Sequence, residues 1–411
     1  MKVCVLTHVY PRFKNDPMPP FIEFTSESIQ KLGVDVTVLT PYHPQFARTK
    51  VDQTVSLQTY KYIFPRKWHL LGYSNTLIHD CQLKKFVYFL APLMFLSGMI
   101  HLLLLHKRRK FDLLHANWLL PNGFIAAVIS KLCNLPLVIT FHGSDVFVSK
   151  QNFLFSSMAK YAMKQADKIT SVSLEFKGYL EEMKIDTQKL HIIPNGVALE
   201  LFENVPQESV AELKQKLGIK KDEQVLFALG RIVWKKGFDY LILAIPKVLE
   251  LVPNLKVIIG GDGSDLNELK QLVCSLELDD VVYFPGAIYR NEIPAYFHLC
   301  DVFVMPAVHD PKGNVDGCPN VVLEAMASSK PVVASNISGI PLVVSHEENG
   351  LLVEEKNIDE LAEAILKLLA EKELRDEFGK ANKEKVLRFL TWSKIAQQFL
   401  TVYQECCTAN T

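Results

Sequence analysis

Residues 225–244, VLFALGRIVWKKGFDYLILA, carry the pattern that decides the fold. An apolar run ends at Gly230, cations follow at Arg231 and Lys236, and Gly237 opens a helix-like stretch. A continuous apolar run is typical of a strand that is covered on both faces, as in a parallel sheet. A strand end, a helix N-terminus and paired cations suit a diphosphate, because Arg grips two oxygens with its fork and Lys adds a point charge. A solvated basic loop is the alternative, but the place directly after a buried strand favours anion binding.

The same alternation of apolar runs and helix-like stretches extends over most of the chain. The strand candidates are residues 3–7, 34–40, 111–116, 135–143, 167–173, 190–196, 225–230, 255–261, 281–286, 301–306, 330–335 and 350–355. The helical stretches include residues 21–32, 122–133, 237–251, 264–276, 319–329 and 357–370. Strands that alternate with helices in this way predict the α/β class, with doubly wound parallel sheets.

A polar stretch at residues 199–224 separates two halves that each show this alternation. We therefore expect one α/β domain over residues 1–198 and a second over residues 199–390. Residues 391–411 are expected to form a helix that packs back on the first domain. Two such domains favour a ligand held between them, at the carboxyl ends of the strands.

The composition excludes several classes of protein. The 411 residues are 49% hydrophobic, which excludes a disordered chain, and the 45 basic residues are balanced by 45 acidic ones. A formal net charge of zero leaves no broad basic footprint for nucleic acid. The eight cysteines form no C-x-x-C pair, so reduced thiols and a cytoplasmic location are expected. The first residues, MKVCVLT, make a poor signal peptide.

One apolar run, residues 86–105, is long enough to be a transmembrane candidate. Lys84 and Lys85 precede it and the basic residues 106–110 follow. A span here would separate the strand at residues 3–7 from the units after residue 110, so we expect a buried or interfacial helix. Its basic flanks leave two alternatives open, namely a helix that only covers the sheet and one that also makes peripheral contact with anionic lipid at the inner face of the membrane.

A second informative segment is DGCPNVVLEAMA, residues 316–327. Pro319 stands where a helix is expected to begin, because proline is favoured at the first helical position. Backbone N–H groups that could face an anion or sugar hydroxyls are expected around Gly317, Cys318 and Asn320. Glu324 could accept two hydrogen bonds from a ribose diol, as acidic residues do in dinucleotide folds. The alternative is a dipole-stabilising Asp316 and an ordinary surface glutamate.

Together these segments resemble glycosyltransferase family 4, whose members have the GT-B fold. The matching pieces in the second half are GRIVWKKG (230–237), GGDGSD (260–265), FPGAIYRNEIPAYFHLCDVFVMPA (284–307), DGCPNVVLEAMASSKPVVAS (316–335) and ENGLLV (348–353). In the first half they are HANWLLPNG (115–123), TFHGSDV (140–146) and IIPNGV (192–197). The resemblance implies two Rossmann-like doubly wound domains that face a central cleft, with the nucleotide sugar held by the second domain.

The resemblance also assigns roles to residues of the donor site. It implies that Arg231 and Lys236 bind the donor diphosphate and that Glu324 holds the ribose. Asp316 stands at the first acidic position of the family, where a glutamate is more usual and contacts hydroxyls of the donor sugar. The shorter aspartate leaves the identity of that sugar in doubt.

Five further residues receive expectations at this stage. Gly261 and Gly263 would let the chain approach the nucleotide closely, and Gly286 would flank the base. Ordinary turn glycines are an equal alternative. His142, from the first domain, would contact the donor sugar or the leaving group, although a lone histidine after a strand is more often structural. Asp145 would either orient His142 or cap the next helix.

The sequence departs from the family pattern in two loops. Residues 10–21 are rich in proline and lack the paired glycines of many members, and this loop is expected to shape the choice of acceptor. Residues 338–344 have Ser and Leu where a second Gly and a Glu are common. The sequence offers no physical account of the second departure.

The implied function is retaining transfer of a hexosyl group from a UDP- or GDP-sugar to an acceptor hydroxyl, in polysaccharide or glycolipid biosynthesis. The expected partners are a nucleotide-sugar donor and a glycan or lipid-linked acceptor, without nucleic acid. We expect no cofactor and no metal, because no D-x-D motif stands at a strand end. The alternatives are a phosphorylase or nucleotide-sugar epimerase of similar fold, or a non-catalytic nucleotide-sugar-binding protein.

Overall fold

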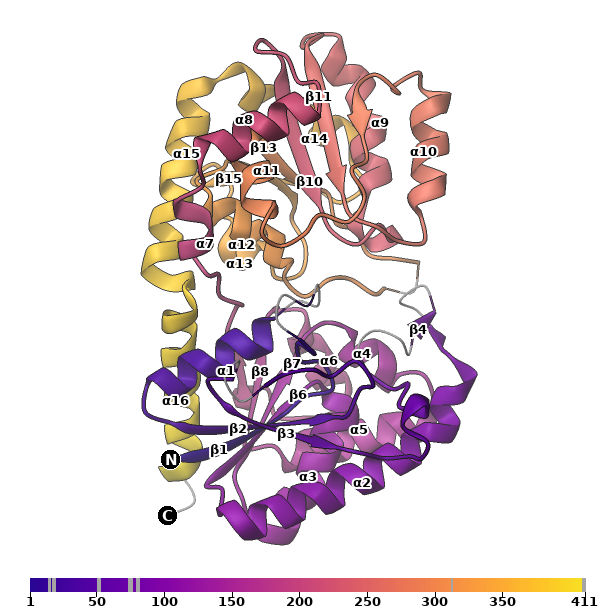
Figure 1. The fold of residues 1–411 in the computed structure, drawn as a ribbon, viewed down its shortest axis with the longest axis vertical. Coiled ribbons are helices and arrows are strands. Elements are labelled where there is room, and N and C mark those ends of the chain that lie inside the picture. Colours follow the sequence, from indigo (N-terminus) through magenta and orange to yellow (C-terminus); the bar gives the residue numbers. More distant parts are fainter. Residues whose placement is uncertain are drawn as a thin grey trace. The chain divides into compact units, whose positions relative to one another are not determined.

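The computed structural model describes residues 1–13, 16, 20–49, 53–72, 77–78, 82–311 and 313–408 (Figure 1). The chain forms two compact units. The first contains Met1–Asn195 together with Trp392–Thr411, and the second contains Gly196–Thr391. The helix α16 (Trp392–Thr408) therefore belongs to the first unit, although it follows the second unit in the sequence.

A seven-stranded parallel sheet forms the centre of the first unit, in the order β3-β2-β1-β6-β7-β8-β9. Its strands are β1 (Lys2–Leu6), β2 (Asp35–Pro41), β3 (Ser56–Tyr60), β6 (Leu113–Asn117), β7 (Leu137–Phe141), β8 (Lys168–Ser171) and β9 (Leu190–Ile192). The middle strands β6 and β7 are wholly buried, which accounts for their continuous apolar runs. The apolar pattern missed β3, because this edge strand is partly exposed and reads SLQTY.

Helices and a short ribbon complete the first unit. The helices are α1 (Phe21–Lys31), α2 (Lys85–Arg109), α3 (Phe124–Cys133), α4 (Ser144–Ser149), α5 (Phe153–Gln165), α6 (Phe176–Glu182) and α16. Strands β4 (Leu77–Ile78) and β5 (Gln82–Leu83) pair antiparallel. Helix α16 contacts α1 and is tied to the sheet by buried polar groups, since the Tyr403 hydroxyl lies 2.6 Å from Nδ1 of His115.

The long apolar run forms α2, which contacts α3 and the strands β2 and β3. By length and composition this helix could cross a membrane. One face of it, however, is part of the core of the first unit, through Val87, Leu90, Ala91, Met94 and Leu102. The packing agrees with the interpretation of this segment as a helix that covers the sheet.

The second unit contains a six-stranded parallel sheet in the order β12-β11-β10-β13-β14-β15. Its strands are β10 (Gln224–Leu229), β11 (Leu255–Gly260), β12 (Val282–Tyr283), β13 (Val302–Met305), β14 (Val332–Ser335) and β15 (Gly350–Val353). Its helices are α7 (Glu200–Glu203), α8 (Gln207–Lys216), α9 (Phe238–Leu249), α10 (Leu266–Ser275), α11 (Ile293–Leu299), α12 (Asn320–Ala327), α13 (Ile340–Val343), α14 (Ile358–Ala370) and α15 (Lys372–Lys385). The polar stretch after residue 199 forms α7 and α8 within this unit.

Both sheets contain a point where neighbouring strands are not consecutive in the chain. In the first unit β1 lies beside β6, and in the second β10 lies beside β13. Open parallel sheets bind ligands outside the carboxyl ends of the strands at such a point. The loops after β10 and β13 are therefore where the second unit is expected to hold its ligand.

Candidate active site

The loop after β10 is seated on the end of β13 by backbone contacts. Gly237 has φ +64 and caps α9, and a Cβ at this position would lie 1.8 Å from the carbonyl oxygen of Pro306. The Val308 N–H donates to the carbonyl of Lys235 at 3.0 Å. Only glycine fits this conformation and this approach together. The sequence signal at Gly237 thus has a structural reason beyond the opening of a helix.

This seating brings two consecutive lysines onto one carboxylate. The Nζ of Lys235 lies 2.9 Å from Oδ1 of Asp316, and the Nζ of Lys236 lies 2.5 Å from Oδ2. Both lysines are only 8% exposed. Burial acts to raise the pKa of Asp316, but the two ammonium groups outweigh it and hold that pKa well below its usual range. Asp316 is therefore ionised and held at both oxygens.

Lys235 is the residue of this cluster that the sequence analysis missed. The sequence indicates a role for Lys235 only through its place next to Lys236. That place is weak evidence, because consecutive side chains in a 3-10 turn need not face the same partner. Arg231, two residues after the end of β10, is exposed. Arg231 lies in the same loop as Lys235 and Lys236, so the loop after β10 brings three cationic residues of the kind that bind anionic ligands.

The segment from Gly317 to Asn320 leads into α12. The helix begins at Asn320, one residue later than predicted. Pro319 is its N-cap residue and not its first helical residue, because the ψ of Pro319 is 117°, which is extended. No side chain caps this end. The N–H of Val322 donates to the carbonyl of Pro319 at 3.0 Å, and the earlier N–H groups of the first turn lie at the positive end of the helix dipole. Such N–H groups favour an anion or a hydroxyl oxygen.

The serine of the second departure from the family pattern now has a physical account, whereas nothing in the structure explains the leucine. Ser338 has φ +57, a left-handed conformation that favours glycine. Its hydroxyl donates to the carbonyl of Gly317 at 2.8 Å, and the N–H of Gly339 donates to the same oxygen at 2.7 Å. Ser338 therefore replaces the freedom of a glycine by a hydrogen bond that fixes the loop between Asp316 and α12.

Glu324 lies just over one turn inside α12, and its side chain is partly exposed. Burial raises the pKa of its carboxyl to about 7, against the opposing effect of Arg290. Near neutral pH this carboxyl therefore changes between a carboxylate that accepts two hydrogen bonds and an acid that can also donate one.

The predicted glycines of this unit are explained first by contacts within the chain. A Cβ on Gly261 would lie 1.8 Å from the carbonyl oxygen of Gly230, and one on Gly263 would lie 2.0 Å from that of Ile232. A Cβ on Gly286 would have nothing within 4 Å, although its φ is +79. The first two glycines let the loops after β10 and β11 touch. Their approach to a nucleotide stays a prediction, as does the place of Gly286 beside the base.

His142 follows β7 in the first unit and is surrounded by rings. Its Nε2 lies 2.9 Å from Oδ1 of Asn117, and its ring centroid lies 4.5 Å from that of Trp118 and 5.1 Å from that of Phe21. Burial lowers the pKa of His142 to about 3, so the ring is neutral at neutral pH. It can exchange hydrogen bonds but does not supply a proton. The side chain of Asp145 and much of the loop over residues 10–21 lie outside the described residues.

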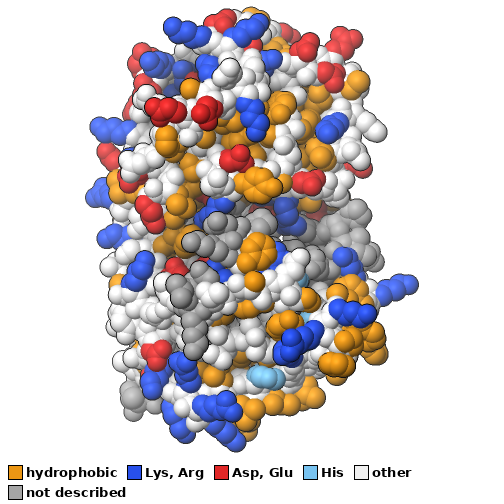
Figure 2. Space-filling model, in the orientation of Figure 1, with side chains coloured by type: hydrophobic (Ala, Val, Ile, Leu, Met, Phe, Trp, Pro, Cys, Tyr) orange, Lys and Arg blue, Asp and Glu red, His pale blue; other side chains and the backbone are white. Residues whose placement is uncertain are grey.

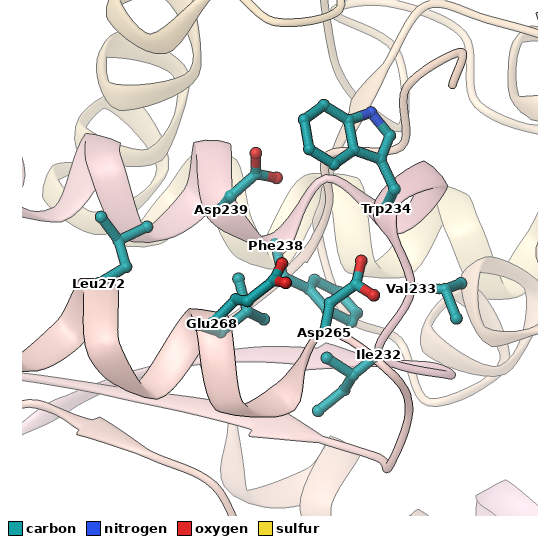
Figure 3. Close-up of a pocket in the computed structure, with 9 residues that line it drawn as sticks. Ile232, Val233, Trp234, Phe238, Asp239, Asp265, Glu268 and Leu272 are labelled. Carbon is teal, nitrogen blue, oxygen red and sulfur yellow. The ribbon is translucent and has the colours of Figure 1, made fainter. Parts of the chain in front are cut away.

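A pocket between α9 and α10 is distinct from the lysine cluster (Figure 3). The carboxylates of Asp239, Asp265 and Glu268 line it together with Trp234. Burial and the charge of Asp265 raise the pKa of Asp239. A pocket with this charge disfavours a diphosphate, which leaves the cations around Asp316 as the candidate anion site of the second unit.

Two family models match the chain. Glycosyltransferase Family 4 matches residues 22–201, and Glycosyl transferases group 1 matches residues 209–385. The chain belongs to this glycosyltransferase family. The second model covers Arg231, Lys235, Asp316 and Glu324, so the anion site lies in the part of the chain that the family shares.

Named relatives and solved structures agree with the assignment of the chain to the glycosyltransferases. MJ1607, an uncharacterized glycosyltransferase of Methanocaldococcus jannaschii, is 28% identical over 72% of this chain and 75% of its own length. A UDP-Gal:alpha-D-GlcNAc-diphosphoundecaprenol alpha-1,3-galactosyltransferase of Escherichia coli is 29% identical over 68% of this chain and 72% of its own. The structure of Anabaena Alr3699/HepE in complex with UDP matches with a TM-score of 0.75 at 20% identity, over 98% of this chain and 100% of that one. This glycosyltransferase has the GT-B fold and uses a nucleotide-sugar donor.

Proposed function

We propose that this glycosyltransferase moves a hexosyl group from a UDP- or GDP-sugar to a hydroxyl of a lipid-linked or glycan acceptor, with retention of anomeric configuration. The observation that carries the proposal is the pair of lysines, Lys235 and Lys236, on Asp316. They lie in the loop after β10, which also contains Arg231, in the same unit as the start of α12. The UDP bound by Alr3699/HepE and the diphosphoundecaprenol acceptor in the name of the E. coli relative support the donor and acceptor classes.

The proposed chemistry places positive charge on the anomeric carbon and negative charge on the leaving diphosphate. Arg231, Lys236 and the N–H groups at the start of α12 stabilise the negative charge, and fixed charges of this kind supply a large part of a rate enhancement. These cations are also the reason for the proposal that the reaction needs no metal. Glu324 holds the ribose, and neutral His142 contributes a hydrogen bond to the sugar or to the leaving group.

Retention is proposed to follow a front-face path. The bond between the anomeric carbon and the acceptor oxygen forms on the face from which the diphosphate leaves, and an oxygen of the leaving phosphate takes the proton of the acceptor hydroxyl. No covalent sugar–enzyme intermediate arises on this path. Proton NMR of the first product formed should show the donor's anomeric configuration. A glycosylated carboxylate detected in the protein by mass spectrometry would contradict the front-face path.

The donor site can be tested without knowing the acceptor. Calorimetric titration with UDP, GDP and ADP is expected to show selective binding of one diphosphate, unchanged by EDTA. Arg231→Ala should weaken that binding about 100-fold, because it removes a bidentate charged contact worth about 3 kcal/mol. Lys247→Ala is the matched control, since this cation pairs with Asp359 and Glu363 on an exposed face of the same unit.

Other outcomes of the titration favour the alternatives. If no diphosphate binds, a non-catalytic protein is favoured over a transferase. Loss of binding with EDTA would refute metal independence. Conversion of one nucleotide sugar into another without an acceptor would identify an epimerase. Release of a sugar phosphate from a glycan by inorganic phosphate would identify a phosphorylase.

The outer face of α2 supports peripheral contact with a membrane that carries the acceptor. Its exposed apolar residues recur at helical spacing, at Phe89, Leu93, Leu96, Ile100 and Leu104. Lys84 and Lys85 stand at the start of the helix, and residues 106–110 at its end are basic. Figure 2 shows hydrophobic side chains with Lys and Arg beside them along the lower edge of the first unit. An apolar face with cationic ends is suited to the surface of an anionic bilayer.

Sedimentation with liposomes tests this contact. The protein is expected to pellet with vesicles of phosphatidylglycerol at low salt and much less with phosphatidylcholine alone. The double variant Leu96→Gln, Ile100→Gln should lose most of this binding, because it removes two apolar side chains from the middle of the face. Leu251→Gln, at an exposed site of the second unit, should bind as the unaltered protein does. Equal pelleting of all three proteins would refute the proposed face.

A further inference from the structure

The contacts of Asp316 present a conflict for the proposed donor site. Lys236 is proposed to bind the diphosphate, yet its Nζ lies 2.5 Å from Oδ2 of Asp316. Lys235 holds the other oxygen of the same carboxylate at 2.9 Å. An ammonium group has three donors and some freedom of direction, so Lys236 can turn towards an arriving phosphate. The free-energy cost of that turn depends on which cations remain beside the Asp316 carboxylate.

A buried carboxylate that loses its last cation is strongly destabilised. Lys235 provides a second cation for Asp316, because its Nζ lies 2.9 Å from the other carboxylate oxygen and need not move when Lys236 turns away. Lys235 is also held in place from its backbone, since its carbonyl accepts from the N–H of Val308. The two lysines therefore differ in what surrounds them: the stem of Lys236 lies over Gly230, at the end of β10, whereas Lys235 is tied to the end of β13.

We propose that Lys235 is a positioning residue that retains Asp316 while Lys236 exchanges that carboxylate for the donor diphosphate. Asp316 then stays ionised and fixed, ready to accept a hydrogen bond from a hydroxyl of the donor sugar. The inference rests on the proposed function, because it concerns the binding of a nucleoside diphosphate at this site. It also gives a reason for the aspartate at a position where the family more often has glutamate, since the shorter side chain is held between two adjacent lysines.

The test uses whichever of UDP and GDP the unaltered protein binds, measured by calorimetry. In Lys235→Met, Asp316 keeps an ion pair with Lys236 alone among the residues that the structure describes, and we expect diphosphate affinity to fall about tenfold. Asp316→Asn alone should change affinity by less than about threefold, because an amide needs no counter-charge. The double variant Lys235→Met, Asp316→Asn should recover the affinity of Asp316→Asn, since Lys236 is then free to turn.

Two further variants separate positioning from folding and from charge. Lys235→Arg keeps a cation and should retain most of the affinity lost in Lys235→Met. Lys247→Met removes a lysine that bridges two carboxylates elsewhere in the unit and should bind as the unaltered protein does. A general loss of structure would not be reversed by Asp316→Asn, so recovery in the double variant identifies the exchange.

The inference and the proposed function fail in different ways. Absence of diphosphate binding by the unaltered protein overturns the proposed function. Binding that is lost in Arg231→Ala but unchanged in Lys235→Met overturns only the role of Lys235. A double variant as weak as Lys235→Met also overturns it, because Lys235 would then contact the diphosphate itself.

Discussion

Gly261→Ala is expected to lower the free energy of unfolding of the second unit by about 3 kcal/mol or more and to abolish diphosphate binding. Two costs add at this position. The backbone has φ +136, which residues with a side chain rarely adopt, and the new Cβ would lie 1.8 Å from the carbonyl oxygen of Gly230. That carbonyl belongs to the backbone at the end of β10, so relief requires moving the loop that carries Arg231.

Gly218→Ala is the matched control for this substitution. Its φ of +66 imposes a backbone strain of about 1 to 2 kcal/mol, but its Cβ would have nothing within 4 Å. Urea unfolding of both variants, with calorimetric titration of UDP and GDP, checks the prediction. Equal losses of stability in the two variants would show that backbone strain alone matters and that the contact with Gly230 is unimportant.

Glu324→Gln is expected to stabilise the protein while it weakens donor binding. Burial raises the pKa of Glu324 to about 7, above the 4.5 of an exposed glutamate, so the folded state prefers the protonated form. The stability that this preference gives is complete below pH 4.5 and is lost as the pH rises through 7. The difference between these two pKa values corresponds to a loss of roughly 3 kcal/mol in the free energy of unfolding at pH 8. The glutamine variant should recover this stability at pH 8. At pH 4 the two proteins should be equally stable.

Donor binding should respond to Glu324 in the opposite direction. The carboxylate above pH 7 accepts two hydrogen bonds from a ribose diol, and glutamine has only one acceptor oxygen. We expect UDP or GDP affinity at pH 8 to fall about tenfold in Glu324→Gln, and the variant to lose the decline that the unaltered protein shows between pH 8 and pH 6. Urea unfolding and calorimetry over this range provide the measurements, with Glu377→Gln on the exposed surface of α15 as control. A stabilised variant with unchanged affinity would remove Glu324 from the ribose site.

Much of the architecture could be predicted from local pattern. Strands such as β6, β7 and β10 are buried on both faces, so each had to be a continuous apolar run, and the run is visible without a structure. The edge strand β3 was missed for the same reason, because an edge strand that is partly exposed needs no such run. The start of α12 was misplaced by one residue, since proline suits both the N-cap and the first helical position.

The candidate site was predictable only in part. The family pattern pointed to Arg231, Lys236, Asp316 and Glu324, because each stands in a motif with a recognisable spacing. Nothing in that spacing distinguishes Lys235 from a solvated neighbour of Lys236. Its role in holding Asp316 follows from the contact between residues about 80 positions apart in the chain, which only the folded sheet creates.

The sequence by itself determined the class of the fold, the family and the cationic loop after β10, because apolar runs, glycines and charged residues at fixed spacing are local properties of the chain. The tertiary structure decided which charges meet. It set two lysines on one carboxylate, gave Ser338 a hydrogen bond to the carbonyl of Gly317 and raised the pKa of Glu324 by burial. These three outcomes depend on distance and exposure between segments far apart in the sequence, and it is packing of the strands and helices that sets both.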